Sequence, residues 1–351
     1  MSYERVADLD LRIDEFDLEL RTRDTSSGFE RITTVVSLHG DGETGNGEDV
    51  TYDGDANVVF ARSDVSLPIP HDGTLDAFSD RLAQTDLFPA MEPEQPVFRN
   101  YRRWAFESAA LDLALKQAEQ NLGTRLDRTY DPVRFVVSTR LGEPQTGDRV
   151  LEWLGRNPDL EFKLDPVSAW TDETIERLAA TDAVRILDLK GLYHGTNVDQ
   201  PANPELYERV LDGFPDALIE DPNLTDETRP LFEGDEHRVT WDYPIRGIET
   251  IEELPWEPDW LNIKPSRFGS LGTLFDSIEY CLDHDIELFG GGQFELDVGR
   301  EHLHAIASLF YPGSPNDVAP SGYNDPNPSD RLPSSPLEVP SDPRGLSWTD
   351  S

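Results

Sequence analysis

From about residue 130 onward, short apolar runs alternate with segments of helical periodicity. Strands that alternate with helices pair in parallel, and repeated βα units close into a barrel whose strand C-termini meet at one mouth. The pattern predicts seven such units. The expected strands are 134–138, 160–164, 184–189, 217–220, 238–242, 261–264 and 287–289, and the expected helices are 147–155, 171–180, 204–213, 226–232, 248–254, 272–284 and 298–310.

The first 130 residues have a different pattern. Apolar and polar residues alternate with period two over 9–21 and 29–38, which indicates antiparallel strands. A small α+β domain is therefore expected over 1–130, followed by the barrel over 131–323. The other elements expected in the N-terminal domain are a mobile Gly- and acid-rich loop at 41–55, a strand at 58–62, a helix at 74–84, a loop at 86–96 and a long helix at 101–122. Gly123 is expected to end this long helix.

A proline-rich segment follows the last helix, running from Pro312 to beyond Pro343 and ending in a Pro/Ser-rich tail over 324–351. Such composition is typical of disorder. Packing of part of this segment along the junction of the two domains is the alternative.

The charge balance changes which partners are expected. The chain has 70 acidic and 30 basic residues, a net charge of −40, which argues against nucleic acid and anionic membranes. The periodic patterns and a hydrophobic share of 37% argue against disorder, so a halophilic protein adapted to concentrated salt is expected. No apolar run approaches the length of about 18 that a membrane helix needs, and the first residues lack a signal region, so a cytoplasmic location is predicted. A single cysteine, Cys281, excludes a disulfide framework.

Lysine is rare in this chain, and its positions are informative. The sequence has only Lys116, Lys163, Lys190 and Lys264, while the other basic residues are Arg. The last three lie at the ends of predicted barrel strands, whereas Lys116 lies on a helix and is expected at the surface. Lysine can be deprotonated when it is desolvated, and arginine cannot. A role in proton transfer or substrate binding at the barrel mouth therefore explains why lysine is used at these three positions in a chain that otherwise uses arginine.

Three carboxylates end successive strands of the predicted barrel. Asp188, Glu220 and Asp242 are separated by 32 and 22 residues, one βα unit each, so they should converge. Clustered carboxylates repel unless a hard cation such as Mg²⁺ takes their oxygens as ligands. The alternative is that acidic residues end these strands by chance, since the chain has 70 acids. All three carboxylates lie inside apolar runs, which favours a metal site over chance.

These motifs together resemble the enolase superfamily, in particular its branch of muconate-cycloisomerase-like and o-succinylbenzoate-synthase-like enzymes. The resemblance implies an α/β fold in which an N-terminal α+β capping domain precedes a modified TIM barrel, (β/α)7β. It implies Mg²⁺, with Mn²⁺ as an alternative. Gly291-Gly-Gln-Phe-Glu295 resembles the superfamily's glycine-rich turn after strand seven. The residues matched are Asp188, Glu220 in Ile-Glu-Asp-Pro and Asp242 as metal ligands, Lys264 in Asn-Ile-Lys-Pro as base, Lys163 as carboxylate binder or second acid/base, and Gln293 and Glu295 as substrate-binding residues. Asp165, which does not match the pattern, is also expected to bind the substrate.

Two positions depart from the superfamily pattern. The second strand normally carries Lys-x-Lys with an acid/base second lysine, but here the motif is Lys163-Leu-Asp165. The third strand normally carries Asp-x-Asn, but here it is Asp188-Leu-Lys190. Residues two apart on a strand face the same way, so Lys190 should point into the mouth near Asp165. The pair is either a relocated catalytic lysine with its carboxylate or a structural ion pair.

The function predicted from the sequence is Mg²⁺-assisted abstraction of a proton α to the carboxylate of a small molecule. The resulting enediolate would collapse by elimination or by reprotonation, which makes the protein a lyase or an isomerase. The alternative is a catalytically degenerate member that binds a metal or ligand. The capping domain is expected to close over the mouth and select the substrate, and the sequence leaves a homo-oligomer open.

Overall fold

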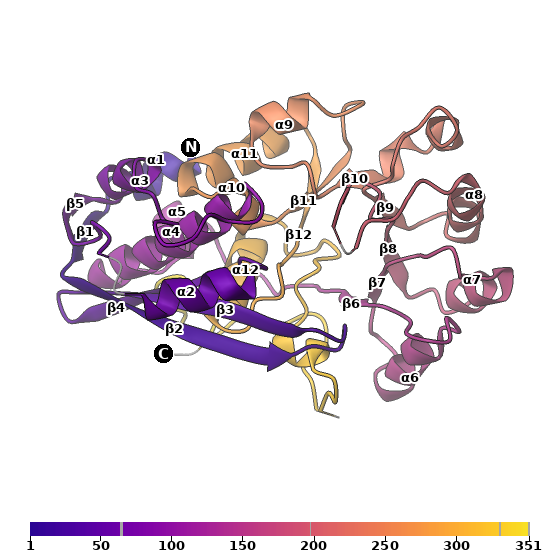
Figure 1. Cartoon of the computed structure of the whole chain (residues 1–351), viewed down its shortest axis with the longest axis horizontal. Helices are drawn as coiled ribbons and strands as arrows, with labels where there is room; N and C mark the ends of the chain where they lie inside the picture. Colours follow the sequence, from indigo (N-terminus) through magenta and orange to yellow (C-terminus); the bar gives the residue numbers. More distant parts are fainter. Residues whose placement is uncertain (64–65, 197, 330, 350–351) are drawn as a thin grey trace.

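The barrel expected from the apolar runs is present as one curled parallel sheet (Figure 1). The computed structural model describes residues 1–63, 66–196, 198–329 and 331–349. Neighbouring strands follow chain order, as repeated right-handed βα units require. The strands are β6 (Val137–Thr139), β7 (Phe162–Leu164), β8 (Val184–Asp188), β9 (Leu218–Glu220), β10 (Val239–Trp241), β11 (Trp260–Ile263) and β12 (Glu287–Gly290).

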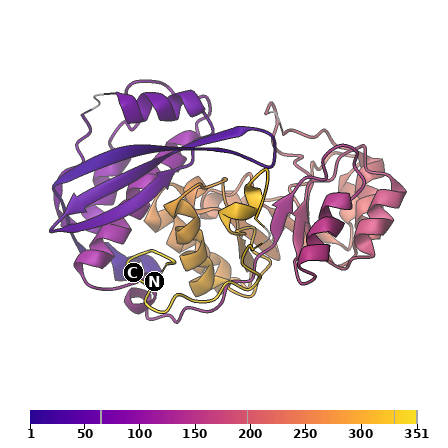
Figure 2. The same ribbon diagram turned by 90° about the horizontal axis from the view of Figure 1, so that it is seen from below.

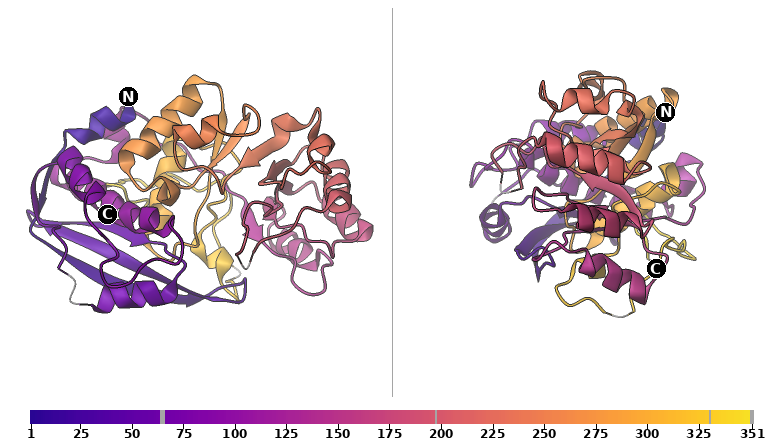
Figure 3. Two further views of the ribbon diagram at one scale, coloured as in Figure 1. Left: turned by 45° about the horizontal axis from the view of Figure 1, so that its top comes forward. Right: turned by 90° about the vertical axis from the view of Figure 1, so that its right-hand side faces the viewer.

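Helices cover the outer face of this sheet. Figure 3 shows α6, α7 and α8 side by side along it. Each expected helix is found within a few residues of its predicted bounds, except that 226–232 forms only a short 3₁₀ turn, η1 (Arg229–Phe232). The helices are α6 (Asp148–Arg156), α7 (Asp172–Ala179), α8 (Pro204–Gly213), α9 (Ile248–Glu252), α10 (Pro265–Phe268), α11 (Leu271–Asp283) and α12 (Val298–Phe310).

The last strand of the barrel is reduced to isolated bridges. Asn316 pairs in parallel with Phe135, and Asp317 pairs in parallel with Gly291. The Asn316 side chain accepts the N–H of Gly290 at 2.6 Å and donates to the carbonyl of Arg134 at 3.0 Å. One short segment therefore joins the β12 edge to the chain before β6 and closes the ring.

The N-terminal domain is built on the antiparallel sheet β2-β3-β4, with a separate β1–β5 pair. Figure 2 shows the long β2–β3 hairpin running from this domain toward the C-terminal segment, where Ser26 N–H donates to the carbonyl of Asn324. The elements are α1 (Ser2–Ala7), β1 (Asp10–Ile13), β2 (Glu15–Asp24), β3 (Glu30–Gly40), β4 (Glu43–Asp49), α2 (Gly54–Arg62), β5 (His71–Thr74), α3 (Leu75–Ala83), α4 (Phe98–Gln117) and α5 (Leu122–Leu126).

Two predictions for this domain are wrong. The segment 41–55, expected as a mobile loop, contains strand β4, which pairs with β3 over seven positions. The segment 58–62, expected as a strand, lies in helix α2, whose N-terminus is capped by the Asp53 side chain on the N–H of Ala56. The long helix was expected over 101–122, but α4 begins at Phe98 and ends at Gln117. Gly123 therefore does not end it and lies in α5 instead.

The glycines of β4 explain why a loop-like composition forms a strand. A Cβ at Gly47 would overlap the carbonyl oxygen of Ala105 on α4, and one at Gly45 would overlap that of Ala109. Glycine is used here because the helix backbone lies directly on the strand. The Gly-rich composition of this segment indicates a flexible loop. The structure shows instead that glycine is needed because α4 packs closely against β4.

Replacing Gly47 by alanine should destabilise the protein by about 1–3 kcal/mol or more, since the added methyl group has no space. The matched control is Gly155→Ala, in the last turn of α6, where a Cβ would meet nothing within 4 Å. That variant should be neutral or up to about 1 kcal/mol more stable, because alanine is the better helix former. Denaturant unfolding of the two variants checks this prediction, and equal stabilities would contradict it.

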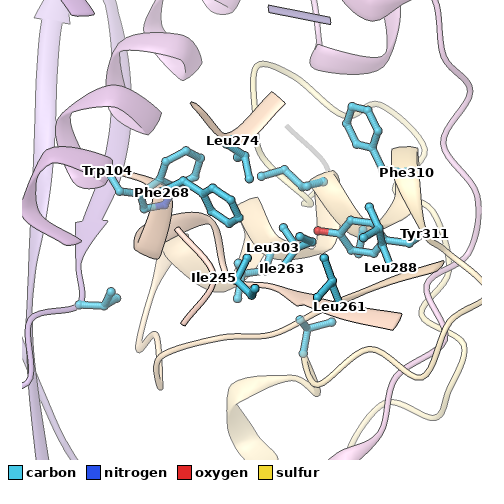
Figure 4. Close-up of a cluster of buried hydrophobic side chains, with 14 of the residues drawn as sticks. Trp104, Ile245, Leu261, Ile263, Phe268, Leu274, Leu288, Leu303, Phe310 and Tyr311 are labelled. Atoms are coloured by element: carbon cyan, nitrogen blue, oxygen red, sulfur yellow. The ribbon is translucent and has the colours of Figure 1, made fainter. Parts of the chain in front are cut away.

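A continuous core joins the two domains. Figure 4 shows Trp104 of α4 beside Phe268 and near Leu274 of α11, with Leu261 and Ile263 of β11 below them. All of these side chains are buried. The N-terminal domain therefore sits against the barrel through a shared hydrophobic layer.

Part of the proline-rich tail packs along the domain junction, which was the expected alternative to a disordered tail. Leu337 exchanges backbone hydrogen bonds with Val133, and Gly345 bridges to Asn121 ahead of α5. Leu346 and Trp348 are buried. Within the described part of the chain, the helices are too short or too polar to cross a membrane.

Candidate active site

Ionisable side chains gather where the parallel strands end. Asp188 and Glu220 are register partners on β8 and β9, and Asp242 directly follows β10. All three are fully buried, and so is Asp221. Parallel strands present their C-termini at one edge, so these carboxylates share the mouth of the barrel as expected.

The tightest acidic group differs by one member from the set expected from the sequence. Asp188, Glu220 and Asp221 each offer an oxygen within 4.8 Å of the others. Asp221 takes the place of Asp242, which was expected from the sequence as the third ligand. Carboxylate oxygens are the ligands that hard divalent cations take, so the chemistry of this donor set fits such an ion.

Asp221 and Asp242 have different partners. The two oxygens of Asp221 accept the backbone N–H groups of Asp242 and Tyr243, each at 3.0 Å. The Asp242 carboxylate contacts Lys264 Nζ at 2.7 Å and Arg267 Nε at 3.0 Å, and accepts the Tyr193 hydroxyl at 2.7 Å. Asp221 thus fixes the backbone at the end of β10, while Asp242 is held by two cations.

Lys163 lies at the centre of the cluster with 1% of its side chain exposed. Its Nζ is 2.5 Å from Glu220 Oε1, 3.3 Å from Asp188 Oδ2 and 3.2 Å from Asp317 Oδ2. The second Glu220 oxygen accepts the side-chain amide of Asn262 at 3.1 Å. A buried ammonium needs such partners because isolated charge is costly to desolvate.

The protonation equilibria of the cluster are strongly perturbed. Burial alone would raise the pKa of Asp188, but the charges of Lys190 and Lys163 outweigh it and hold that pKa below its usual range. Burial and the charges of Asp242 and Asp188 raise the pKa of Asp221 to about 7. Burial also raises the pKa of Glu220 well above its ordinary value, against the effect of Lys163. The lysines therefore compensate only part of the acidic charge, and a further cation would favour full ionisation.

Asp165 and Lys190, the two positions expected from the sequence to depart from the superfamily pattern, face each other. Lys190 Nζ forms an ion pair with Asp188 Oδ2 and lies 3.8 Å from Asp165 Oδ1. Asp165 Oδ2 is 3.3 Å from Nε of the half-exposed Arg140. Lys190 is thus within salt-bridge reach of Asp165, as predicted, but its closer partner is Asp188.

Gln293 and Glu295 lie in the turn after β12, beside the N-terminal domain. The Gln293 amide donates to the Tyr101 hydroxyl at 3.1 Å, and Glu295 pairs with Arg300 at 3.0 Å. Both are buried. Their contacts tie the turn to α4 and α12, and their assignment to substrate stays a prediction.

Sequence reasoning missed Asp221 in the acidic group itself. It also missed four residues that contact the cluster: Asp317, Arg267, Tyr193 and Asn262. Asn262 and Arg267 lie within three residues of Lys264, so a wider window around that motif could have found them. Asp317 lies in the proline-rich segment and carries no local signal. Lys116, expected as a surface residue, is also partly buried and pairs with Asp112 at 2.7 Å.

The N-terminal domain closes against the mouth, as expected from the sequence. Arg31 of β3 donates to the carbonyl of Gln293 at 3.0 Å, and Phe29 makes an edge contact with Phe294. Glu48 of β4 accepts the backbone N–H groups of Leu296, Asp297 and Gly299 at 2.7–3.0 Å. Burial raises the pKa of Glu48, and the hydrogen bonds from the Thr33 hydroxyl and from the N–H groups of Leu296 and Asp297 act against it.

Comparison with known protein families gives matches over both domains. Residues 4–125 match the N-terminal domain, and residues 129–325 the C-terminal domain, of a family described as a domain of unknown function, DUF8230. An o-succinylbenzoate synthase from Listeria innocua is 24% identical over 223 residues. That alignment covers 62% of this chain and 58% of the Listeria protein, so the match spans less than two thirds of that enzyme.

Solved structures of enolase-superfamily members have the same fold. A member from Listeria innocua superposes with a TM-score of 0.69 at 17% identity, covering 97% of this chain and 95% of that one. A dipeptide epimerase from Methylococcus capsulatus in complex with Mg gives 0.72 at 17% identity, with 97% and 100% covered. A muconate cycloisomerase from Pseudomonas fluorescens gives 0.64 at 16% identity, with 88% and 87% covered. These likenesses confirm the capping domain and modified barrel expected from the motifs.

Proposed function

From the premise that this chain belongs to the DUF8230 family and has the enolase-superfamily fold, we propose that it is a metal-dependent enzyme that removes a proton α to the carboxylate of a small carboxylic acid. Elimination or epimerisation would follow. The observation that carries the proposal is the position of Lys264, a 7% exposed lysine at the edge of the acidic cluster.

The charges at the mouth support a divalent cation. Among the residues that the structure describes, and leaving aside the half-exposed Arg140, the cluster has six carboxylates and four cations with side chains no more than 16% exposed. Their formal charge is −2, which one such ion would neutralise. Mg²⁺ is proposed, with Mn²⁺ as an alternative. The carboxylates are Asp165, Asp188, Glu220, Asp221, Asp242 and Asp317, and the cations are Lys163, Lys190, Lys264 and Arg267.

When bound, the ion would supply electrostatic stabilisation for negative charge that develops on the substrate carboxylate. Asp188 and Glu220 would hold it, together with Asp242 or Asp221. Lys264 would take the α-proton, because it directly follows β11, at one side of the acidic strands β8–β10. Lys163 and Lys190 stand on the other side, on β7 and after β8, and would bind the substrate carboxylate or return a proton.

One observation favours a second function, a binding protein without catalysis. Asp188, Glu220 and Asp242 are all in direct contact with lysine. In addition, position 165, where the resemblance leads us to expect a second acid/base lysine, is an aspartate. Carboxylates that are neutralised by lysines of the same chain form a stable site whether or not the protein catalyses a reaction. Under this alternative the metal or ligand would bind without any exchange of substrate protons.

The deciding experiment is α-proton exchange with deuterated solvent in the presence of Mg²⁺, followed by NMR across a library of carboxylic acids. Dipeptides belong in the library because one structural relative is a dipeptide epimerase. Exchange with any acid supports the enzyme, and the product then separates elimination from epimerisation. Binding of an acid with no exchange at any Mg²⁺ concentration would support the binding protein instead. The cytoplasmic location and salt adaptation stay predictions.

A further inference from the structure

The Asp188 carboxylate, a candidate metal ligand, contacts two lysine side chains at once. Its Oδ1 accepts the backbone N–H of Lys190 at 3.0 Å. Its Oδ2 contacts both Lys163 Nζ and Lys190 Nζ. A cation that uses Asp188 therefore has to displace or repel at least one ammonium group.

The two lysines differ in how easily they can leave. Lys163 is 1% exposed and holds three carboxylates at once, so moving it would leave Glu220 and Asp317 without their ion pair. Lys190 is 14% exposed and forms one close ion pair. Lysine has a long flexible stem, so its ammonium can move several ångströms while the backbone stays in place.

Lys190 has a second carboxylate, Asp165, within ion-pair distance. Asp165 Oδ1 lies 3.8 Å from its Nζ, and the only other cation recorded on Asp165 among the described residues, Arg140, contacts the opposite oxygen, Oδ2. The ring of Tyr193 also lies 5.1 Å from Nζ and can stabilise the charge along the way. Lys190 therefore has one partner in the metal set and another outside it.

We propose that Lys190 is a built-in competitor of the metal, which pairs with Asp188 in the metal-free protein and transfers to Asp165 when a divalent cation binds. This rests on the proposed metal-dependent function and adds a role for the two positions that depart from the superfamily pattern. Asp165 lowers the free energy of the metal-bound state by accepting the displaced ammonium. The two substitutions thus act as one unit that sets metal affinity.

The backbone makes Lys190→Asn a suitable test variant. Lys190 has φ +52, in the left-handed region that Asn adopts more readily than Lys does. The variant should therefore fold, and a thermal melt without metal verifies this. Lys116→Asn is the matched control, because it removes the same charge from the α4 pair with Asp112 outside the barrel mouth.

The experiment measures Mn²⁺ affinity from the EPR signal of the free ion, and Mg²⁺ affinity by calorimetry. About 1 M KCl screens weak binding to the acidic surface. Lys190→Asn should bind about tenfold or more tightly than wild type, because a cation next to the metal is gone. Lys116→Asn should leave the affinity unchanged. Asp165→Asn should weaken binding in the wild-type background and have little effect in the Lys190→Asn background.

The outcomes separate this inference from the proposed function. Unchanged or weaker metal binding by Lys190→Asn would overturn the competition. Equal effects of Asp165→Asn in both backgrounds would overturn the transfer, since Asp165 would then act only as one more negative charge. Failure of proton exchange at saturating metal would instead remove the proposed enzyme and leave the competition standing.

Discussion

Replacing Lys264 by alanine should lower the rate of α-proton exchange by about 10²–10⁴-fold, the contribution that a positioned acid/base group makes. Lys264→Arg should lose nearly as much, because arginine keeps the charge and cannot be deprotonated at accessible pH. Asp242 would keep Arg267 and the Tyr193 hydroxyl as partners in both variants, so the fold should persist. The measurement is exchange or turnover at saturating Mg²⁺, with a melting curve for each variant.

The control for this prediction is Lys116→Ala, which removes the chain's one lysine outside the barrel mouth and should leave the rate intact. Lys264→Ala with full exchange activity would assign the base elsewhere, first to Lys190 or Lys163. Loss of activity in the alanine variant with retention in Lys264→Arg would mean that charge alone is required. Each result therefore identifies a different role for the residue.

The largest effect on stability is expected for Lys163→Met. Its ammonium touches three carboxylates in a nearly dry environment, so its removal leaves buried acids without a counter-charge. Breaking a buried ion pair from one side costs about 3–5 kcal/mol. We expect that loss in EDTA, and partial recovery on adding Mg²⁺, because an ion that binds the native cluster stabilises it by mass action.

Denaturant unfolding of wild type and Lys163→Met, each with EDTA and with Mg²⁺, measures this effect. The matched control is Lys116→Met, which also breaks a partly buried lysine pair but should respond to Mg²⁺ no more than wild type does. An equal gain from Mg²⁺ in all three proteins would show that the ion does not compensate for Lys163. A loss below about 1 kcal/mol would indicate an ion pair that contributes as little as surface pairs do.

The carboxyl ends of the barrel strands could be identified from the sequence because the relevant physics is local and repeats. Each short apolar run has to be a strand buried on both faces, and each βα unit returns the chain in the same direction. Asp188 and Glu220 were therefore correctly placed as neighbours at one edge, and Lys163 and Lys264 at the same mouth. The order of residues along the chain was sufficient for this.

The N-terminal domain was less predictable because its local signals conflict with its packing. Gly45 and Gly47 have the composition of a loop but form part of β4, since α4 lies too close for any side chain. The segment 58–62 has strand-like composition but belongs to α2, where Phe60 turns into the core. Tertiary contacts override weak propensities in both cases.

By itself the sequence determined that the charged residues Lys163, Asp188, Glu220, Asp242 and Lys264 reach the mouth of this barrel, because strand order and the two-residue period fix where the side chains at the strand ends lie. Only the tertiary structure decided which charges pair. Asp242 forms an ion pair with Arg267. Asp317, from the proline-rich segment, pairs with Lys163. Lys190 lies closer to Asp188 than to Asp165. Such pairing depends on differences of about an ångström between strands far apart in the chain, and no local pattern encodes them.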